Sequence, residues 1–506
     1  HSLTIPCVFR LQCALFYNLL IGYAMKFQWN KQYTDAVVIA LVIIFPIVLA
    51  GVPIGDDYVR LYNGIDFNGS GRWFATWLFQ VLSNDKFIFN LFPLPQILGI
   101  IIYAISLAWI TQKLSITDRI SNALIILFAL SFPFIFQNYA YQYDCLTMML
   151  ALSIFSITPF ILIPQEKDKK QWVMYSLFKV LLLITGLLFY QPALISFIIF
   201  SIFIYLVSDD RKLNILFWHA IILIIAYFVD NFVVLSIGDT QYYKEFSRFN
   251  LSELHMNIYS NVISILNYVK PYYKNIFIIV SHMIILFAAL KYLLINQKST
   301  SNIIVNMFGV LLLLFITILF ISILDRRILF PIFFTPRLLM SMSSAYFCIA
   351  LIAFKQKQQI KLLRTMLIIA IIPAIVVLCI YTKAASIQEK YDRMLITSLY
   401  DGLSKVEIKE NQKIYFTCNQ HWYAPYTKKV VERYPYMMGF IYTDYLRRYW
   451  FIREYLGDYN IDTTNISSVY AKNESDYNAM YQSNRLVSHY LYDIYEWQDN
   501  IYVCVK

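Results

Sequence analysis

The stretch AVVIALVIIFPIVLAGVPIGDDYVRLYNG, residues 36–64, places an uncharged apolar run directly before two adjacent carboxylates and an arginine. A membrane-spanning helix needs about 20 mostly apolar residues, and the run from Ala36 to Ala50 forms the uncharged centre of such a segment at 35–53. Asp56, Asp57 and Arg60 follow where the chain leaves this run. The order predicts a membrane protein whose charged groups gather at one membrane surface.

The composition of the whole chain supports this prediction. Of the 506 residues, 59% are hydrophobic and 14% are charged, whereas soluble domains carry about 25% charged residues. The net charge is +11, but the stretch from Lys383 to Lys506 contains 15 basic and 15 acidic residues and is neutral. The excess therefore belongs to the membrane part. Because no soluble basic module is present, the composition excludes a nucleic-acid-binding protein.

The apolar segments predict an all-α polytopic membrane protein with a small α+β domain at its C-terminus. We expect about 11 transmembrane helices, at 35–53, 91–110, 120–138, 145–163, 172–189, 192–208, 214–237, 275–295, 302–324, 338–354 and 365–382. The predicted domains are an N-terminal extension and cytoplasmic start (1–34), a transmembrane domain (35–382) with an outer loop at 54–90, and a C-terminal domain (383–506).

Basic residues in the short loops predict the orientation. Lys26, Lys31, Lys113 and Arg119 lie in loops on the same side as Met25, which the excess of Lys and Arg assigns to the cytoplasm. The loop 54–90 and the C-terminal domain then lie outside, in the periplasm of a bacterial host. The stretch before Met25 is either an interfacial segment or an upstream extension.

Two motifs of the outer loop carry candidate functional residues. If a helix starts after Gly55, Asp56 and Asp57 both come near Arg60 on one helix face. Either carboxylate is then a candidate base, although a simple helix cap at Asp56 explains the pattern as well. The turn NGSGRW, residues 68–73, delivers Arg72 ahead of an apolar segment that we expect to lie flat in the interface.

Further candidates lie at the outer ends of later segments. The motif YQYD ends in Asp144, a rival for the role of base, and contains Tyr141 and Tyr143, while Tyr190 and Gln191 form a tight outer turn. Three outer arginines break the preference of basic residues for the inside, and they suit a phosphate or an anionic lipid headgroup. These three arginines are Arg326, Arg327 and Arg337.

Together these residue types suit the transfer of a sugar from a lipid phosphate. The acceptor hydroxyl must lose a proton to a carboxylate, and the departing phosphate needs positive charge. Tyrosines supply surfaces on which a sugar can stack. No metal is required if arginines stabilise the phosphate, and no metal-binding spacing is present in the sequence.

At this point the sequence resembles a known family. DDYVRLYNG, GSGRW, YQYD, FYQPAL and PRLLMS are similar, in the same order, to motifs of the serotype-converting O-antigen glucosyltransferases of enteric bacteria and their phages. The resemblance runs from about Lys26 to the last predicted span. It implies a GT-C-type glycosyltransferase of the inner membrane, with its active site on the periplasmic face.

The resemblance also implies substrates, partners and residue roles. The donor would be undecaprenyl-phosphate glucose and the acceptor a sugar of the lipid-linked O-antigen, with a small donor flippase and a donor-synthesising glucosyltransferase as partners besides membrane lipids. Asp57 or Asp56 would act as base. Arg60 and Arg72 would hold the loop or the donor phosphate, Arg326, Arg327 and Arg337 the phosphate, and Asp144, Tyr190 and Gln191 the sugar.

Two other functions stay open at this stage. A transporter of polyprenyl lipids or sugars would need several charged residues at mid-membrane, where the sequence has only Lys179 and Asp230. An O-antigen polymerase also carries outward arginines, but it would not need the paired aspartates. In the tail we expect a helix near 384–403, strands at 413–419 and 500–506, and a disulfide between Cys418 and Cys504 if the compartment is oxidising.

Overall fold

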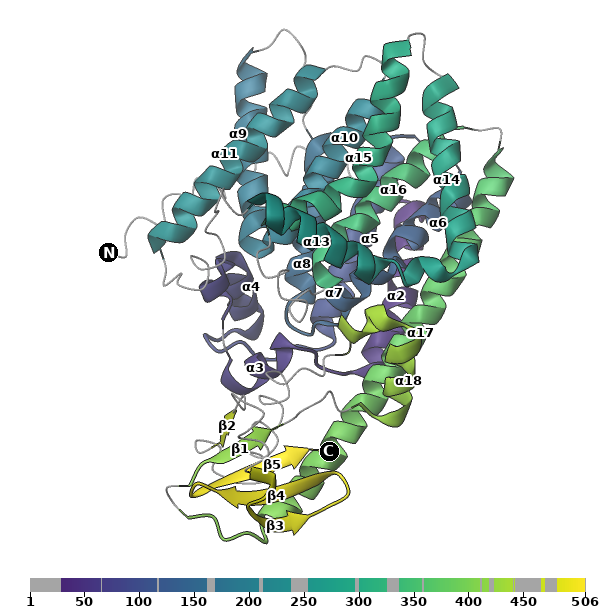
Figure 1. Ribbon diagram of the computed structural model, residues 1–506. Coiled ribbons are helices and arrows are strands. Elements are labelled where there is room, and N and C mark those ends of the chain that lie inside the picture. Colours follow the sequence, from purple (N-terminus) through teal and green to yellow (C-terminus); the bar gives the residue numbers. More distant parts are fainter. Residues whose placement is uncertain are drawn as a thin grey trace.

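The computed structural model describes residues 29–64, 66–115, 118–161, 169–208, 213–237, 254–295, 300–324, 336–356, 359–409, 412–417, 423–439, 441, 466–468 and 480–505. This part of the chain is mostly helical, with a small sheet at the C-terminal end (Figure 1). The α-helices are α2 (Lys31–Ala50), α3 (Asp56–Asn63), α4 (Trp73–Ser83), α5 (Leu94–Lys113), α6 (Arg119–Leu130), α7 (Phe136–Ala140), α8 (Cys145–Ile157), α9 (Lys169–Phe189), α10 (Ile195–Val207), α11 (Leu213–Ile237), α13 (Leu254–Val269), α14 (Ile276–Ile295), α15 (Thr300–Leu324), α16 (Ser341–Phe354), α17 (Ile360–Leu403) and α18 (Pro425–Arg433).

Short 3-10 turns and five strands complete the described elements. The turns are η1 (Asn68–Ser70), η2 (Pro133–Ile135), η3 (Thr158–Phe160), η4 (Gln191–Leu194), η5 (Tyr272–Lys274), η7 (Pro336–Met340) and η9 (Pro435–Gly439). The strands are β1 (Ile414–Thr417), β2 (Ile466–Ser468), β3 (Asn484–Ser488), β4 (Tyr492–Trp497) and β5 (Asn500–Val505).

Helix α2 illustrates how the apolar segments fold. The Asn30 side chain accepts hydrogen bonds from the first-turn amides of Gln32 and Tyr33 and so caps the helix, which ends at Gly51 with φ 62°. One face buries small and branched residues such as Ala40, whereas Phe45 on another face is 60% exposed. Large exposed apolar side chains of this kind suit contact with lipid tails rather than with water.

The structure supports part of the predicted set of membrane spans. Within the described residues, 7 helices are long and apolar enough to cross a membrane, or 8 if one bent pair counts as a single span. Each of the 11 predicted segments overlaps a helix; three of them correspond to shorter apolar stretches among the described side chains, at Cys145–Phe160, Gln191–Val207 and Met307–Ser322, the last of which lies within the 25-residue helix α15. In the first two of these, Pro159 and Pro192 fall in 3-10 turns, because proline cannot donate the backbone hydrogen bond that an α-helix requires.

The bent pair corrects the predicted span at 120–138. Helix α6 and the segment Pro133–Ala140 meet at 57°, and the chain then turns through Tyr141–Asp144 into α8. This turn, which we expected at the outer end of two spans, is buried, because Tyr141, Tyr143 and Asp144 are at most 1% exposed. The break at Pro133 thus folds the YQYD motif into the protein interior.

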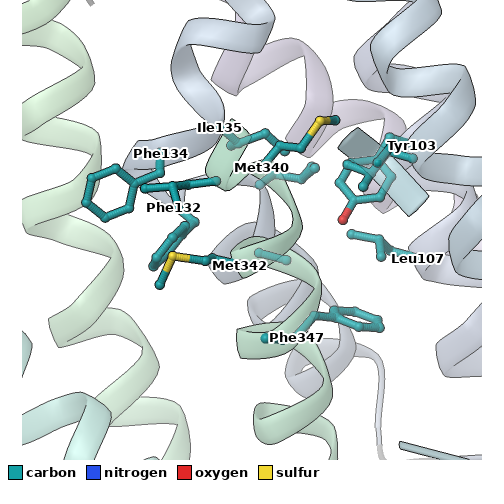
Figure 2. Packing of buried hydrophobic residues seen from close by; sticks show 14 of the residues in the cluster. Tyr103, Leu107, Phe132, Phe134, Ile135, Met340, Met342 and Phe347 are labelled. Atoms are coloured by element: carbon teal, nitrogen blue, oxygen red, sulfur yellow. The ribbon is translucent and has the colours of Figure 1, made fainter. Parts of the chain in front are cut away.

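The interior around this break is packed with large apolar side chains. Figure 2 shows Phe132, Phe134 and Ile135 from the bend in one buried cluster with Met340, Met342 and Phe347 of η7 and α16 and with Tyr103 and Leu107 of α5. The Tyr103 hydroxyl lies 3.3 Å from the hydroxyls of both Ser343 and Ser344. Because this part of the bundle is closely packed and its polar groups are paired, it supports the YQYD turn that follows the bend.

Helix α17 differs from the expectation of a span followed by a separate helix. It runs without a break for 44 residues, through Pro373, from the bundle to the C-terminal sheet (Figure 1). The sequence after the predicted span is rich in helix-forming residues, and Gly402 is the first glycine in it. Nothing in the sequence therefore stops the helix before its last turn.

The small sheet confirms the α+β character of the C-terminal region. Its strand order is β2-β1-β5-β4-β3; β1 is parallel to β2 and β5, and the remaining pairs are antiparallel. Both predicted strands are present, as β1 and β5. One face of the sheet packs on the end of α17 through Leu395, Leu399, Leu403, Ile414, Ile494, Ile501 and Val503. Cys418 lies outside the described residues, so its pairing with Cys504 stays a prediction.

Gly402 provides a test of how α17 holds the sheet. A Cβ atom there would lie 2.4 Å from the hydroxyl oxygen of Tyr492, which donates to the Ser398 carbonyl at 2.5 Å. Because Tyr492 is only 2% exposed, its ring has little room to move. We expect Gly402→Ala to destabilise the protein by about 1–3 kcal/mol, measured as thermal unfolding in detergent. Gly69→Ala is the control, since nothing lies within 4 Å of the atom that it adds; equal melting of both variants would contradict this account.

Candidate active site

Asp57 anchors the start of α3 to the buried YQYD turn. Its carboxylate accepts hydrogen bonds from the backbone amides of Ile54 at 3.0 Å, Gln142 at 2.9 Å and Tyr143 at 3.2 Å. The side chain is fully buried. Gly55 precedes it with φ 54°, a conformation that favours glycine and lets the chain leave α2 and turn into α3. Through these three backbone hydrogen bonds, the Asp57 carboxylate links the start of α3 to the bundle.

Two opposing effects act on the pKa of Asp57. Burial raises the pKa of Asp57 to about 7, although the amides of Gln142 and Ile54 favour the ionised form and lower it. Among charged neighbours, Asp144 raises this pKa further and Arg60 lowers it. Asp57 therefore changes charge near neutral pH, whereas an exposed aspartate does so near 3.8.

The shifted pKa predicts a pH dependence of stability. Because the folded protein keeps the Asp57 proton up to about pH 7 while the unfolded chain releases it near 3.8, stability is fully present below pH 3.8 and falls as the pH rises toward 7. The expected slope is about 1.4 kcal/mol per pH unit. Thermal unfolding of Asp57→Asn between these limits should lack this component. An identical pH profile in Asp57→Asn and wild type would contradict the assignment.

Asp144 joins two arginines from different parts of the outer loop. Its Oδ2 atom lies 2.5 Å from Nη1 of Arg60, and its Oδ1 atom lies 2.7 Å from Nη1 of Arg72. The aspartate side chain is fully buried, and the two arginine side chains are 11% and 14% exposed. Arg60 also packs over the Phe67 ring at 4.2 Å, and Arg72 over the Tyr190 ring at 4.7 Å. The outer loop thus folds around one carboxylate.

Positive charge exceeds negative charge at this cluster. Arg337 lies with its guanidinium 5.1 Å from the centre of the Tyr141 ring. Burial lowers the pKa of Arg72. Asp144 and Tyr190 raise this pKa, whereas the positive charges of Arg337 and Arg60 lower it, so both of these guanidinium groups lie close enough to act on Arg72. The buried Nε–H groups of Arg60 and Arg72 have no hydrogen-bond partner within the described part of the chain. An anion with several oxygens would meet both charge and donors here.

The structure gathers most of the predicted site residues. Gln191 donates from Nε2 to the Ser70 carbonyl at 3.5 Å, which brings the tight outer turn against the loop that carries Arg72. Tyr143 is buried beside Phe79, with their ring centres 6.3 Å apart. Arg326, Arg327 and the side chain of Asp56 lie outside the described residues. Asp57, Asp144, Arg60, Arg72, Arg337, Tyr141 and Tyr190 do belong to one connected region.

Three amide residues of the region were not among the predicted site residues. The Gln142 side chain donates to the Gly51 carbonyl at 3.2 Å and accepts from Asn90 Nδ2 at 2.6 Å. Gln137 accepts from the backbone amide of Arg337 at 2.6 Å. The position of Gln142 inside YQYD was the only available signal, since Asn90 at the end of the loop 54–90 and Gln137 within a predicted span follow no distinctive spacing.

Across the described ranges, no group of three or more His, Cys, Asp or Glu side chains is arranged to hold a metal ion. The guanidinium groups of this region can bind an anion, and its tyrosines can position a polar substrate.

Comparison with known proteins identifies the class. Residues 45–344 match the glucosyl transferase GtrII family, and because this match covers more than half of the chain, the protein belongs to that family. The matched region contains α3, α4, the YQYD turn and Arg337, and it ends before the C-terminal sheet. Membership of the GtrII family supports the classification of this protein as a glycosyltransferase.

A relative in a bacteriophage agrees with this classification. The chain is 31% identical over 193 residues to a protein of Salmonella phage P22 described as an uncharacterized 55.3 kDa protein in the gtrB 5' region. The similarity spans 38% of this chain and 38% of that protein. No solved structure matches the chain.

Proposed function

We propose that this protein is a glucosyltransferase that moves glucose from undecaprenyl-phosphate glucose to a sugar of the lipid-linked O-antigen at the periplasmic face of the inner membrane. The observation that carries the proposal is the buried cluster in which Asp144 joins Arg60 and Arg72 beside Arg337. Membership of the GtrII family supports the sugar chemistry.

The arginine cluster suits the phosphate of a lipid-linked donor. Arg60, Arg72 and Arg337 bring three positive charges against Asp144 and the Asp57 carboxyl, whose pKa is about 7, and two of these arginines keep buried Nε–H donors. When the bond between the sugar and the phosphate breaks, negative charge develops on the phosphate oxygen. Guanidinium groups that already lie in fixed positions, with little solvent around them, stabilise this charge strongly. Arg326 and Arg327 are proposed to assist from the adjacent loop.

We assign the general base to Asp56. The carboxylate of Asp57 is engaged by three backbone amides, and each oxygen of Asp144 is engaged by an arginine. A base must reach the acceptor hydroxyl directly or through one water, and both of these side chains are buried. Asp56 is the first residue of α3, and the hydrogen bonds of the neighbouring Asp57 carboxylate hold this end of the helix in place. Asp57 and Asp144 then position the loop and the arginines.

The remaining predicted residues are proposed to line the sugar site. Tyr190 already stacks beneath Arg72, and Tyr141 beneath Arg337, so a hexose attached to the phosphate would meet the edges of these rings. Tyr143 and Gln191 complete the surrounding wall. Direct displacement of the lipid phosphate by the acceptor hydroxyl would invert the configuration of the sugar carbon.

The proposal places the site outside the cytoplasm. The charge bias of the short loops favours a periplasmic position for residues 54–90 and for the C-terminal domain. Undecaprenyl-phosphate glucose would then need a small flippase to reach this side and a cytoplasmic-face glucosyltransferase to make it. Both are proposed partners.

Transfer in isolated membranes tests this function. Membranes that contain the protein would receive radiolabelled undecaprenyl-phosphate glucose and lipid-linked O-antigen, and label in the glycan would be measured. We expect label to move from the donor to the acceptor as single glucose units. Growth of glycan blocks without glucose transfer would indicate a polymerase, and movement of the unchanged lipid across the bilayer would indicate a transporter.

A further inference from the structure

The short helix α3 lies between the membrane bundle and the C-terminal sheet (Figure 1). It has 8 residues, and its N-cap Gly55 makes no side-chain capping bond. Helices this short are not stable on their own in water. The position of α3, and therefore of the residues that it carries, depends on contacts with both neighbours.

Successive residues of α3 contact different parts of the protein. Asp57 binds the backbone of the YQYD turn on the bundle side. Tyr58, which follows it, packs against the apolar cluster of α17 and the sheet. This cluster contains Leu395, Ile396, Leu399, Leu403, Ile414, Phe416, Leu491, Tyr492, Ile494, Ile501 and Val503. Since consecutive side chains are about 100° apart around a helix, the neighbouring residues Asp57 and Tyr58 can reach different partners.

From this arrangement we infer that the C-terminal sheet is a positioning part of the transfer site and that it acts on α3 through Tyr58. The inference rests on the proposed function, because it assigns to Tyr58 the placement of Asp56 and Arg60 relative to the substrates. Tyr58 is a positioning residue and does not itself touch the reacting atoms. The C-terminal region then belongs to the catalytic unit, although the family match ends before it.

Tyr400 offers a matched control for Tyr58. Both tyrosines are partly buried and pack against the same apolar cluster, but Tyr400 projects from α17. Tyr400→Ala therefore removes a similar amount of packing from the cluster without removing the contact of α3. Tyr58→Phe keeps the ring and tests whether the apolar contact is what matters.

Steady-state kinetics of glucose transfer are the first measurement. We expect Tyr58→Ala to lower kcat by about 100-fold, because a shift of about 1 Å in a reacting group has an effect of this size. The KM for the donor should change less than kcat, since only Arg60 of the three arginines proposed to bind the phosphate lies on α3. Tyr58→Phe and Tyr400→Ala should both retain the wild-type kcat. Equal losses in Tyr58→Ala and Tyr400→Ala, or a wild-type kcat in Tyr58→Ala, would overturn the inference.

Hydrogen exchange measured by mass spectrometry provides a readout that does not depend on activity. In Tyr58→Ala the backbone amides of residues 55–63 should exchange faster, whereas in Tyr400→Ala they should exchange as in wild type. If the wild-type protein transfers no glucose, the proposed function fails while this comparison still decides the role of Tyr58. Unchanged exchange of α3 in Tyr58→Ala would show that the sheet does not hold it.

Discussion

Asp56→Asn is expected to reduce glucose transfer by about 100-fold to 10,000-fold, the range that general base catalysis contributes. Asparagine has nearly the same shape as aspartate but cannot take the proton of the acceptor hydroxyl. Stability should change by no more than about 1 kcal/mol, since the main loss is the favourable interaction of a carboxylate with a helix N-terminus. Transfer in membranes and thermal unfolding in detergent measure the two effects separately.

The matched control for this variant is Asp401→Asn. Asp401, in the last turn of α17, forms an exposed ion pair with Lys405 just after this helix, far along the chain from the loop 54–90, and its substitution should leave transfer unchanged. Full activity of Asp56→Asn would remove Asp56 as the base. In that case, loss of activity at wild-type stability in Asp57→Asn or Asp144→Asn would indicate which of the other two carboxylates takes the role.

The second large effect is expected for Asp144→Asn. The substitution leaves Arg60 and Arg72 without the carboxylate that both contact. Removal of one member of a buried ion pair destabilises proteins by about 3–5 kcal/mol, because the remaining charge is buried without compensation. We expect a marked decrease in the thermal midpoint and in the amount of folded protein. Transfer should fall as well, since the arginines lose their fixed positions.

Two further variants test the cause of this loss. Asp401→Asn breaks an exposed pair with the same change of side chain, and such pairs contribute about 0–1 kcal/mol, so its midpoint should stay close to wild type. Combining Asp144→Asn with Arg72→Met removes one of the two uncompensated charges and should restore part of the stability. A double variant less stable than Asp144→Asn alone would contradict the explanation by buried charge.

Local patterns in the sequence predicted much of the architecture. The apolar segments located the helices, because a membrane helix is recognised by its own composition. Composition does not reveal how Pro133, Pro159 and Pro192 bend or shorten individual helices, so the number of 11 spans stays a prediction beside the 7 or 8 described helices that are long and apolar enough to cross a membrane. The extent of α17 was also missed, because a membrane span and an amphipathic helix in sequence give no signal that they are continuous.

The candidate site was predicted as a set of residues but not as a geometry. Motif order brought Arg60, Arg72 and Asp144 into one hypothesis, while their ion pairs join positions 72 and 84 residues apart, beyond the range of any local pattern. The hydrogen bonds that anchor Asp57 also join residues far apart in the sequence, so no local pattern separated its role from that of Asp56. Only the backbone amides of Gln142 and Tyr143 identify Asp57 as a structural anchor.

The unbroken course of α17 has a mechanical consequence. At about 1.5 Å per residue, its 44 residues form a rod about 66 Å long, of which only part lies within a bilayer. A helix answers a thinner bilayer by tilting, and a rigid rod transmits the tilt to everything fixed at its far end. Lipid chain length is thus expected to shift the angle of the C-terminal sheet, so the thickness of the surrounding membrane becomes a physical input to this protein.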